Sequence, residues 1–248
     1  MNLVKQIISY PLSIIYYLFF GLGLLFFHVV QWLGYNLGGY KGHKWAVDFM
    51  YWGLINTTRI LGTRYNAVFK AKLPQNVPLI FVSNHQSLYD INRLALYVKE
   101  HHPKFVSKKE LGKGIPSVSY NLTHGGSVLI DRKDGKQAIL EIKKLGEYIQ
   151  KNKYAAVIFA EGTRSKTGKP KPFKRNGLRI LCKYAPDAYI VPVTINNSYK
   201  MTPNGKSFPL GIGVKIEFIY HEPIAINGRD FTSLIDEVEK TVTDSIVY

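Results

Sequence analysis

Residues 77–90 read VPLIFVSNHQSLYD, and this stretch decides the fold prediction. Residues 77–83 are mostly apolar, which predicts a strand buried on both faces of a sheet. A turn that carries His85 follows, and helical periodicity then runs from Ser87 to Glu100. A strand that passes through a short turn into a helix is the repeating unit of an α/β fold. In such folds, ligands bind beyond the carboxyl ends of the strands.

The same alternation continues along the chain to its C-terminus. Further strands are predicted at residues 104–106, 128–130, 154–160, 189–195 and 214–220, and further helices at 135–150, 177–184 and 231–247. Because helices separate several of these strands, we expect an α/β fold with a mixed, largely parallel sheet flanked by helices. This α/β domain is expected to span residues 63–248.

The first 62 residues differ sharply in composition from the rest. Residues 6–40 contain no Asp, Glu, Lys or Arg. Residues 7–33 would be about 40 Å long as a helix, more than the hydrocarbon core of a bilayer at about 30 Å. Residues 45–61 are apolar at helical spacing, and the glycine-rich stretch 38–42 is typical of a turn. Residues 1–62 are therefore predicted to form a membrane-embedded two-helix hairpin, which either spans the bilayer or lies in one leaflet.

His85 and Asp90 lie close to the predicted helix start. A carboxylate that accepts from one imidazole nitrogen fixes the tautomer and leaves the other nitrogen as a base. Such a pair can take a proton from a substrate hydroxyl near neutral pH. The alternative is structural, because Ser87 and Asp90 also match a capping box that serves only the helix. A metal site on this pair ranks lower, since no third ligand lies close in the sequence.

A second turn with polar residues follows the predicted strand at 154–160, and it reads Glu161-Gly162-Thr163-Arg164. Its glycine permits close backbone approach, its threonine offers a hydroxyl, and its arginine can bind phosphate through two parallel hydrogen bonds. Residues 164–183 contain eight Lys or Arg and no Asp or Glu. This run is either a solvated basic loop or a surface that faces an anion.

The whole chain is basic, with 33 Lys and Arg against 17 Asp and Glu and a net charge of +16. Such a charge favours a polyanionic partner, which is nucleic acid, an anionic membrane or a phosphorylated ligand. No nucleic acid is expected, because the basic run lacks a stacking motif and a recognised nucleic-acid module. The single cysteine, Cys182, excludes an internal disulfide and is expected to be a small buried hydrophobe.

Two other catalytic motifs are excluded by spacing. Five residues rather than four separate Gly162 from Gly168, and Pro170 stands where a P-loop has Ser or Thr, so a nucleotide triphosphatase is rejected. Ser127 lacks the second flanking glycine of a nucleophile elbow, so covalent serine catalysis is unsupported.

Four motif blocks resemble, in order, those of the glycerolipid acyltransferases, specifically the bacterial 1-acylglycerol-3-phosphate (lysophosphatidic acid) acyltransferases. The blocks are Asn84–Ser87 with Asp90, which is the H-x4-D signature, then Lys108–Leu111 with Gly125, Gly126, Asp131 and Arg132, then Phe159–Ser165, and finally Ile190–Val193. The resemblance covers about residues 75–200, and the hydrophobic hairpin also suits the family. Ala160 stands where the family usually has proline before the Glu-Gly-Thr-Arg block.

The resemblance implies acyl transfer from a thioester of coenzyme A or acyl carrier protein to the sn-2 hydroxyl of lysophosphatidic acid, giving phosphatidic acid. In this family His85 would be the general base and Asp90 would hold it. The implied substrate-binding residues are Lys108, Lys109, Arg132, Glu161, Gly162, Thr163 and Arg164. No metal and no cofactor beyond the acyl thioester are implied, because a thiolate is a good leaving group.

The resemblance also implies a bacterial inner-membrane protein whose catalytic domain lies on the cytoplasmic face. Its partners would be the lysophospholipid, the acyl thioester and the membrane surface, with acyl carrier protein as a further candidate; no oligomeric state is assigned. Two alternatives stay open. The same chemistry could use a lyso-aminolipid acceptor without phosphate, or the chain could be a non-catalytic binder of anionic lipid or nucleic acid.

Overall fold

The strands form a sheet in the order β1-β7-β6-β2-β5-β3-β4, with β8 paired to β6. They are β1 (Arg64–Phe69), β2 (Leu79–Ser83), β3 (Lys104–Lys108), β4 (Val128–Ile130), β5 (Ala155–Phe159), β6 (Tyr189–Asn196), β7 (Lys215–Tyr220) and β8 (Ile224–Ala225). Strands β6, β2, β5, β3 and β4 are parallel neighbours, whereas β7 and β8 run antiparallel to β6. The prediction of a mixed, largely parallel sheet is confirmed.

The computed structural model describes residues 3–247, so residues 1–2 of the predicted hairpin and 248 of the predicted α/β domain lie outside the described residues. The α-helices are α1 (Leu3–Thr57), α2 (Tyr89–Tyr97), α3 (Val118–His124), α4 (Gly135–Asn152), α5 (Arg175–Tyr184) and α6 (Phe231–Asp244). Short 3₁₀ turns connect several elements, at Thr58–Leu61 (η1), Lys99–His101 (η2), Lys109–Gly112 (η3), Ser198–Met201 (η4) and Pro203–Gly205 (η5).

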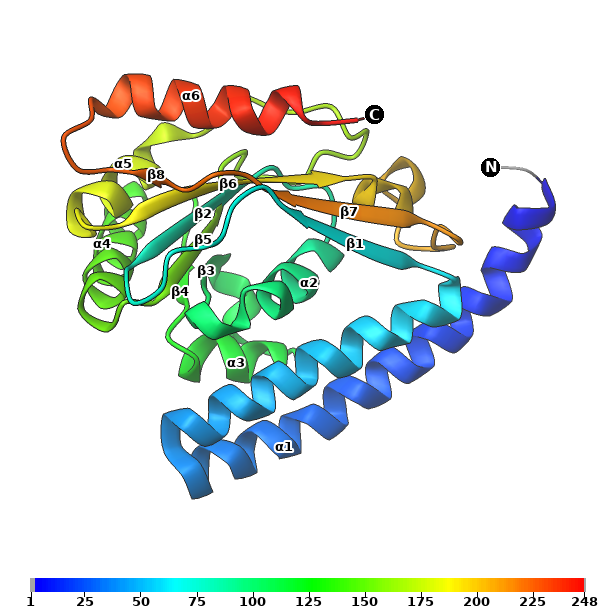
Figure 1. Cartoon of the computed structure of the whole chain (residues 1–248). Helices are drawn as coiled ribbons and strands as arrows, with labels where there is room; N and C mark the ends of the chain where they lie inside the picture. The colour runs from blue at the N-terminus through cyan, green and yellow to red at the C-terminus, as the bar shows by residue number, and fades with distance from the viewer. Residues whose placement is uncertain (1–2, 248) are drawn as a thin grey trace.

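Helices cover both faces of the sheet, with α6 on one side and α1 and α2 on the other (Figure 1). The alternation along β2 explains the two layers. Ile80 and Val82 are fully buried in a cluster with residues of α4, α5 and α6. Leu79 and Phe81 are fully buried in a second cluster that contains residues of α1 and α2. The strand is therefore buried on both faces, as the apolar run predicts.

The element α1 consists of two helical arms that reverse direction at Gly39, where φ is 55° and ψ is −142°. The arms approach closely beside this turn. A Cβ atom on Gly42 would lie 2.2 Å from the carbonyl oxygen of Gly34, and one on Gly34 would lie 2.7 Å from that of Gly42. Only glycine permits this approach. The predicted two-helix hairpin is present, and its reversal at Gly39 lies inside the predicted turn at 38–42, although residues 40–42 are helical.

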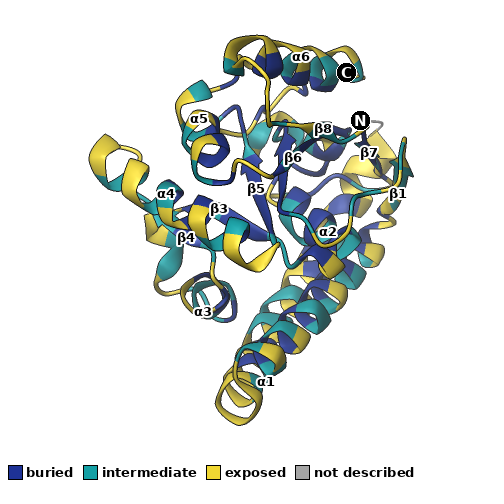
Figure 2. Cartoon of the chain, turned by 60° about the vertical axis from the view of Figure 1, so that its left-hand side comes forward, coloured by how far each residue is buried: buried dark blue, intermediate teal, exposed yellow. Residues whose placement is uncertain are grey.

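The first arm exposes most of its apolar side chains (Figure 2). Within the described residues, one helical stretch, Leu3–Leu61, is long and apolar enough to cross a membrane. Its most apolar window is only 17% buried, which is far too little for a core helix of a soluble domain. An apolar surface of this extent is typical of contact with lipid or with another protein.

The hairpin is joined to the α/β domain along its length. Met50 and Leu54 of the second arm belong to the same buried cluster as Leu94 of α2. The first arm is hydrogen-bonded to loops beyond the carboxyl ends of two strands. Ser13 Oγ accepts from the Leu210 amide at 2.8 Å, after β6, and Ser117 Oγ, after β3, donates to the Leu24 carbonyl at 2.5 Å. The hairpin therefore covers one face of the sheet and is also bonded to loops at the edge where the parallel strands have their carboxyl ends.

Three of the strands and α-helices were not predicted, namely β1, the two-residue strand β8 and α3. Strand β1 is at the edge of the sheet and its residues are mostly half-buried or exposed, so the run RYNAVF lacks an apolar signature. Helix α3 is only seven residues long, too short for a clear helical period. The predicted helix at 87–100 is shorter than expected, because α2 ends at Tyr97 and η2 follows.

Cys182 is buried, as predicted, and burial raises the pKa of its thiol to about 12.

We predict that Gly42→Ala destabilises the folded protein by about 1–3 kcal/mol, because the added methyl group meets the backbone of the other arm. Gly38→Ala is the matched control, since a Cβ there meets nothing within 4 Å. Thermal unfolding in detergent micelles, followed by circular dichroism, measures both variants. Equal unfolding temperatures for the two would show that the arms do not need this contact.

Candidate functional site

All predicted site residues lie at one edge of the sheet. His85 follows β2 and residues 161–164 follow the adjacent strand β5, while Lys108 ends β3 and Arg132 follows β4. These four strands are parallel, so their carboxyl ends lie together. At a strand spacing of about 4.8 Å, the ends of β3 and β4 lie about 10 Å and about 14 Å from the end of β2. The order of the strands therefore places the histidine at one side of a row of basic residues.

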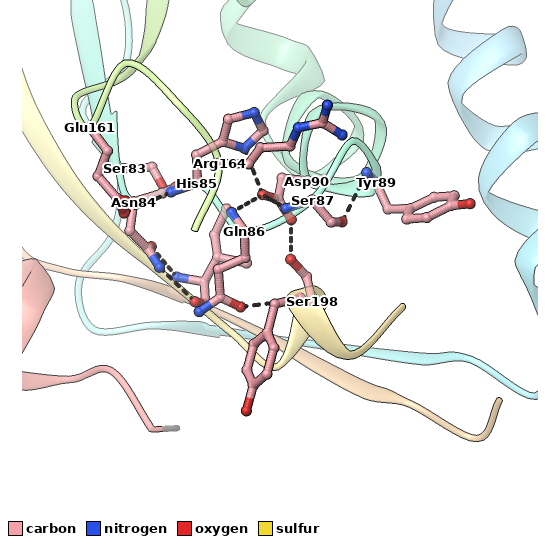
Figure 3. A network of polar contacts seen from close by, with 12 residues as sticks. Ser83, Asn84, His85, Gln86, Ser87, Tyr89, Asp90, Glu161, Arg164 and Ser198 are labelled. Carbon is pink, nitrogen blue, oxygen red and sulfur yellow. Dashed lines mark hydrogen bonds and ion pairs between the residues drawn. The ribbon is translucent and has the colours of Figure 1, made fainter. Parts of the chain in front are cut away.

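His85 and Asp90 form a close pair (Figure 3). The distance from His85 Nδ1 to Asp90 Oδ2 is 2.8 Å. Asp90 is fully buried, whereas 14% of the His85 side chain is exposed. An ionised carboxylate only accepts hydrogen bonds, so Nδ1 carries the proton and Nε2 is left with a free lone pair. The predicted pairing is present, and its catalytic role stays a prediction.

Asp90 also holds the backbone directly before helix α2, so the contacts expected from both alternatives, the pair with His85 and the link at the helix start, are present together. Its Oδ2 accepts from the Gln86 amide at 2.8 Å and from the Ser87 amide at 2.9 Å. Ser87 Oγ in turn accepts from the Tyr89 amide at 3.1 Å. One carboxylate thus fixes both the helix start and the imidazole. The amides of Gln86 and Ser87 both donate to Asp90, so their hydrogens are not free to bind another group.

Three further contacts hold the loop that carries His85. The His85 ring is stacked on Phe159, with ring centroids 4.0 Å apart and 18° between the planes. The His85 carbonyl accepts from the Ser165 amide at 2.7 Å. The Asn84 side chain exchanges two hydrogen bonds with the backbone of Ile195 on β6, at 2.7 and 2.8 Å. Asn84 and Phe159 were quoted in the motif blocks, but the sequence alone assigned them no such role.

Ala160 also contributes through its backbone. Its amide donates to the Ser83 carbonyl at 3.0 Å, directly before the loop that carries His85. Proline has no amide hydrogen and could not make this bond. The departure from the usual family residue therefore adds a link between β5 and β2.

Glu161 lies beneath this loop rather than open to solvent, with 2% of its surface exposed. Its Oε1 accepts from the His85 amide at 3.2 Å, and its Oε2 has no partner in the structure. Burial raises the pKa of Glu161 to about 7, although the bond from the His85 amide and the charge of Lys171 lower it. Gly162 has φ of 70°, and a Cβ there would lie 2.9 Å from the Lys174 side chain.

The remaining predicted residues are exposed at the same edge. Thr163 Oγ1 and the Arg164 carbonyl both accept from Lys171 Nζ, at 3.0 and 2.8 Å. Figure 3 shows that the Arg164 side chain extends past the His85 ring. Lys108 makes an ion pair with Glu110 at 2.8 Å, and Lys109 and Arg132 are exposed. The structure thus brings residues 161–164 against His85, while the other three basic residues lie farther along the edge.

Comparisons with known proteins show the family to which the chain belongs. A family model described as Acyltransferase matches residues 64–196, a range that contains every predicted site residue. The 1-acyl-sn-glycerol-3-phosphate acyltransferase BAT2, chloroplastic, of Brassica napus is 31% identical over 171 residues, which are 69% of this chain and 47% of that protein. The 1-acyl-sn-glycerol-3-phosphate acyltransferase of Helicobacter pylori is 40% identical over 126 residues, which are 49% of this chain and 50% of that protein. The chain spans about half the length of these curated relatives.

A solved structure has the same fold. The crystal structure of the 1-acyl-sn-glycerophosphate (LPA) acyltransferase PlsC from Thermotoga maritima matches with a TM-score of 0.75 and 23% sequence identity. The match covers 98% of this chain and 95% of that chain, so it includes the hairpin as well as the sheet.

Glu161→Gln tests the buried carboxyl group. The folded protein holds the Glu161 proton to about pH 7, whereas an unfolded chain loses it near the ordinary value of 4.5. The folded state binds more protons in this window, so the contribution of Glu161 to the free energy of unfolding falls as pH rises. Relative to Glu161→Gln, the native protein should lose about 1–3 kcal/mol between about pH 5 and pH 8.

Thermal and denaturant unfolding across this pH range measure the difference. Glu147→Gln is the matched control, because the Glu147 side chain is 53% exposed in a surface pair with Lys143. It should follow the pH dependence of the native protein. A difference between native protein and Glu161→Gln that does not vary with pH would contradict the prediction.

Proposed function

Because the chain belongs to the acyltransferase family, we propose that it transfers a fatty acyl group from an acyl thioester to the sn-2 hydroxyl of lysophosphatidic acid, giving phosphatidic acid. Two relatives, from Brassica napus and Helicobacter pylori, are named for this activity on 1-acyl-sn-glycerol-3-phosphate. The observation that carries the proposal is the His85–Asp90 pair, with its Nε2 left unpaired beside the turn at 161–164.

The pair supports a direct transfer. His85 Nε2 takes the proton of the acceptor hydroxyl as its oxygen attacks the thioester carbonyl. The resulting imidazolium is stabilised by Asp90, which accepts from Nδ1–H. When the tetrahedral intermediate collapses, the carbon–sulfur bond breaks and the thiolate takes the proton back from His85. The base is thereby restored, and the donor leaves as a free thiol.

The basic residues at this edge support a phosphate-bearing acceptor over a lyso-aminolipid. Arg164 is held next to His85, because the residue that follows it, Ser165, donates to the His85 carbonyl. Lys108, Lys109 and Arg132 extend the positive charge along the edge. A guanidinium and ammonium groups are suited to a phosphate monoester, and the hydroxyl of the neighbouring threonine is available to the same ligand.

The donor in this proposal is a thioester of coenzyme A or of acyl carrier protein. No metal and no other cofactor take part, because general-base attack on a thioester needs neither. This remains a prediction drawn from the chemistry of the leaving group.

We further propose that residues 1–62 are a membrane anchor and residues 63–248 the catalytic domain. Gly62 ends η1 in a left-handed conformation, and β1 begins at Arg64, which supports the boundary. The arms lie against the α/β domain along their length, so neither could cross a bilayer without drawing polar elements into it. This supports a hairpin that lies in one leaflet. That the membrane is a bacterial inner membrane, with the domain on its cytoplasmic face, is proposed from the family resemblance.

The general-base role predicts the effect of His85→Ala. Acyl transfer to lysophosphatidic acid, assayed by release of free thiol, should fall by about 10²–10⁴-fold. His124→Ala is the matched control, since His124 is exposed on α3 and lies among aromatic rings away from β2. Activity of His85→Ala within about tenfold of the native protein would refute the role. No thiol release by the native protein would favour the non-catalytic binder.

Arg164→Ala distinguishes the two acceptor classes. The KM for lysophosphatidic acid should rise by about tenfold or more, because a hydrogen bond to a charged group contributes about 1.5–3 kcal/mol. Turnover of a lyso-aminolipid without phosphate should be unchanged. Arg229→Ala is the matched control, because Arg229 lies just before α6 and pairs with Glu237 of that helix at 2.5 Å. An equal loss on both lipids would argue against phosphate binding by Arg164.

A further inference from the structure

We propose that Ser198 is a positioning residue for the His85–Asp90 pair, acting through a hydrogen bond from its hydroxyl to the second oxygen of Asp90. The proposal rests on the proposed function for its effect on turnover. Ser198 begins η4, which follows β6. It lies 108 residues from Asp90 in the chain and outside all four motif blocks.

The contact is buried and specific. Ser198 and Asp90 are both 0% exposed, and Ser198 Oγ donates to Asp90 Oδ1 (Figure 3). The other oxygen, Oδ2, accepts from His85 Nδ1 and from the amides of Gln86 and Ser87. Among the described residues, Ser198 is the donor found on Oδ1. Each oxygen of the carboxylate thus has its own donors, which sets the plane of the group and turns Oδ2 toward the imidazole.

The backbone around Ser198 is held by the same loop that carries His85. Asn197 adopts a left-handed conformation, with φ of 67°, which turns the chain out of β6 and into η4. The Tyr199 amide then donates to Gln86 Oε1 at 3.4 Å. Two residues before this turn, Ile195 exchanges hydrogen bonds with Asn84. Contacts on both sides of Ser198 therefore reach the H-x4-D loop, and its hydroxyl has little freedom to move.

The chemistry of the pair explains why this matters for turnover. His85 becomes positively charged in the transition state, and Asp90 must then present Oδ2 in line with Nδ1–H. Without the Ser198 hydroxyl, Oδ1 would be a buried carboxylate oxygen with no donor, which is costly. The carboxylate could then rotate to share its remaining donors between both oxygens. Because Ser198 is fully buried, its loss should change kcat and leave substrate binding unchanged.

Ser198→Ala should lower kcat by about 10- to 100-fold, the loss expected when a hydrogen bond to a charged group is removed, with KM within about twofold. Ser198→Thr keeps the hydroxyl and should retain activity within about threefold. Thr194→Val is the matched control: Thr194 lies on β6, the strand that leads into η4, is 0% exposed, and donates to the Val242 carbonyl on α6. It should lower the unfolding temperature without changing kcat. An equal fall of kcat in Thr194→Val would show a merely structural effect and overturn the proposal.

A double-mutant cycle tests whether Ser198 acts through Asp90. In an Asp90→Ala background, Ser198→Ala should change kcat by less than about twofold, because the group it positions is gone. Independent, multiplicative losses would overturn the proposal. If Ser198→Ala fails to fold, Ser198→Cys places a weaker donor at the same position and should give an intermediate kcat. A Ser198→Cys protein as active as the native one would count against the hydrogen bond.

A measurement without turnover separates this proposal from the proposed function. With nitrogen-15 labelled histidine, the Nδ1–H proton of His85 bonded to Asp90 should resonate far downfield and vanish in His85→Ala. The signal should shift or broaden in Ser198→Ala and persist in Thr194→Val. An unchanged signal in Ser198→Ala would overturn the proposal even if the protein is an acyltransferase. Absence of thiol release by the native protein would overturn the proposed function, and the signal would still test Ser198.

Discussion

The burial of one carboxylate governs the architecture of the site. Asp90 has no exposed surface, and a buried charge is tolerated only when hydrogen bonds replace its lost water. Its donors come from the loop between β2 and α2 and from η4. The order β6-β2-β5 brings these segments together, because β2 is flanked on both sides by parallel neighbours. The Asp90 carboxylate thus accepts the hydrogen bonds that hold the imidazole, the backbone before α2 and the start of η4.

Much of this could be predicted from local sequence. The apolar runs marked five of the parallel strands, and ligands were expected to bind beyond the carboxyl ends of the strands, which is where the candidate residues lie. The alternatives for Asp90 could not be separated by spacing, since capping and holding His85 need the same residue at the same position. The structure shows that both roles use a single oxygen, Oδ2.

Other features could not be predicted from the local sequence. The contact of Ser198 with Asp90 depends on the register of β6 against β2, where Ser83 is opposite Val193. Nothing within either segment specifies that register on its own. Strand β1 was missed because an edge strand with mixed burial resembles a loop in composition. The burial of Glu161 was missed as well, since a charged residue in a turn is normally solvated.

The hairpin is part of the hydrophobic core as well as an apolar surface. Tyr16, Met50 and Leu54 belong to the same buried cluster as Phe81 at the centre of the sheet. A shortened chain that starts after Gly62 would therefore expose the apolar residues on one face of the sheet. Such a fragment would aggregate in water rather than behave as a soluble enzyme. Trimming the apolar arms to ease purification is thus the wrong route, and lipid nanodiscs or micelles around the intact chain are the right one.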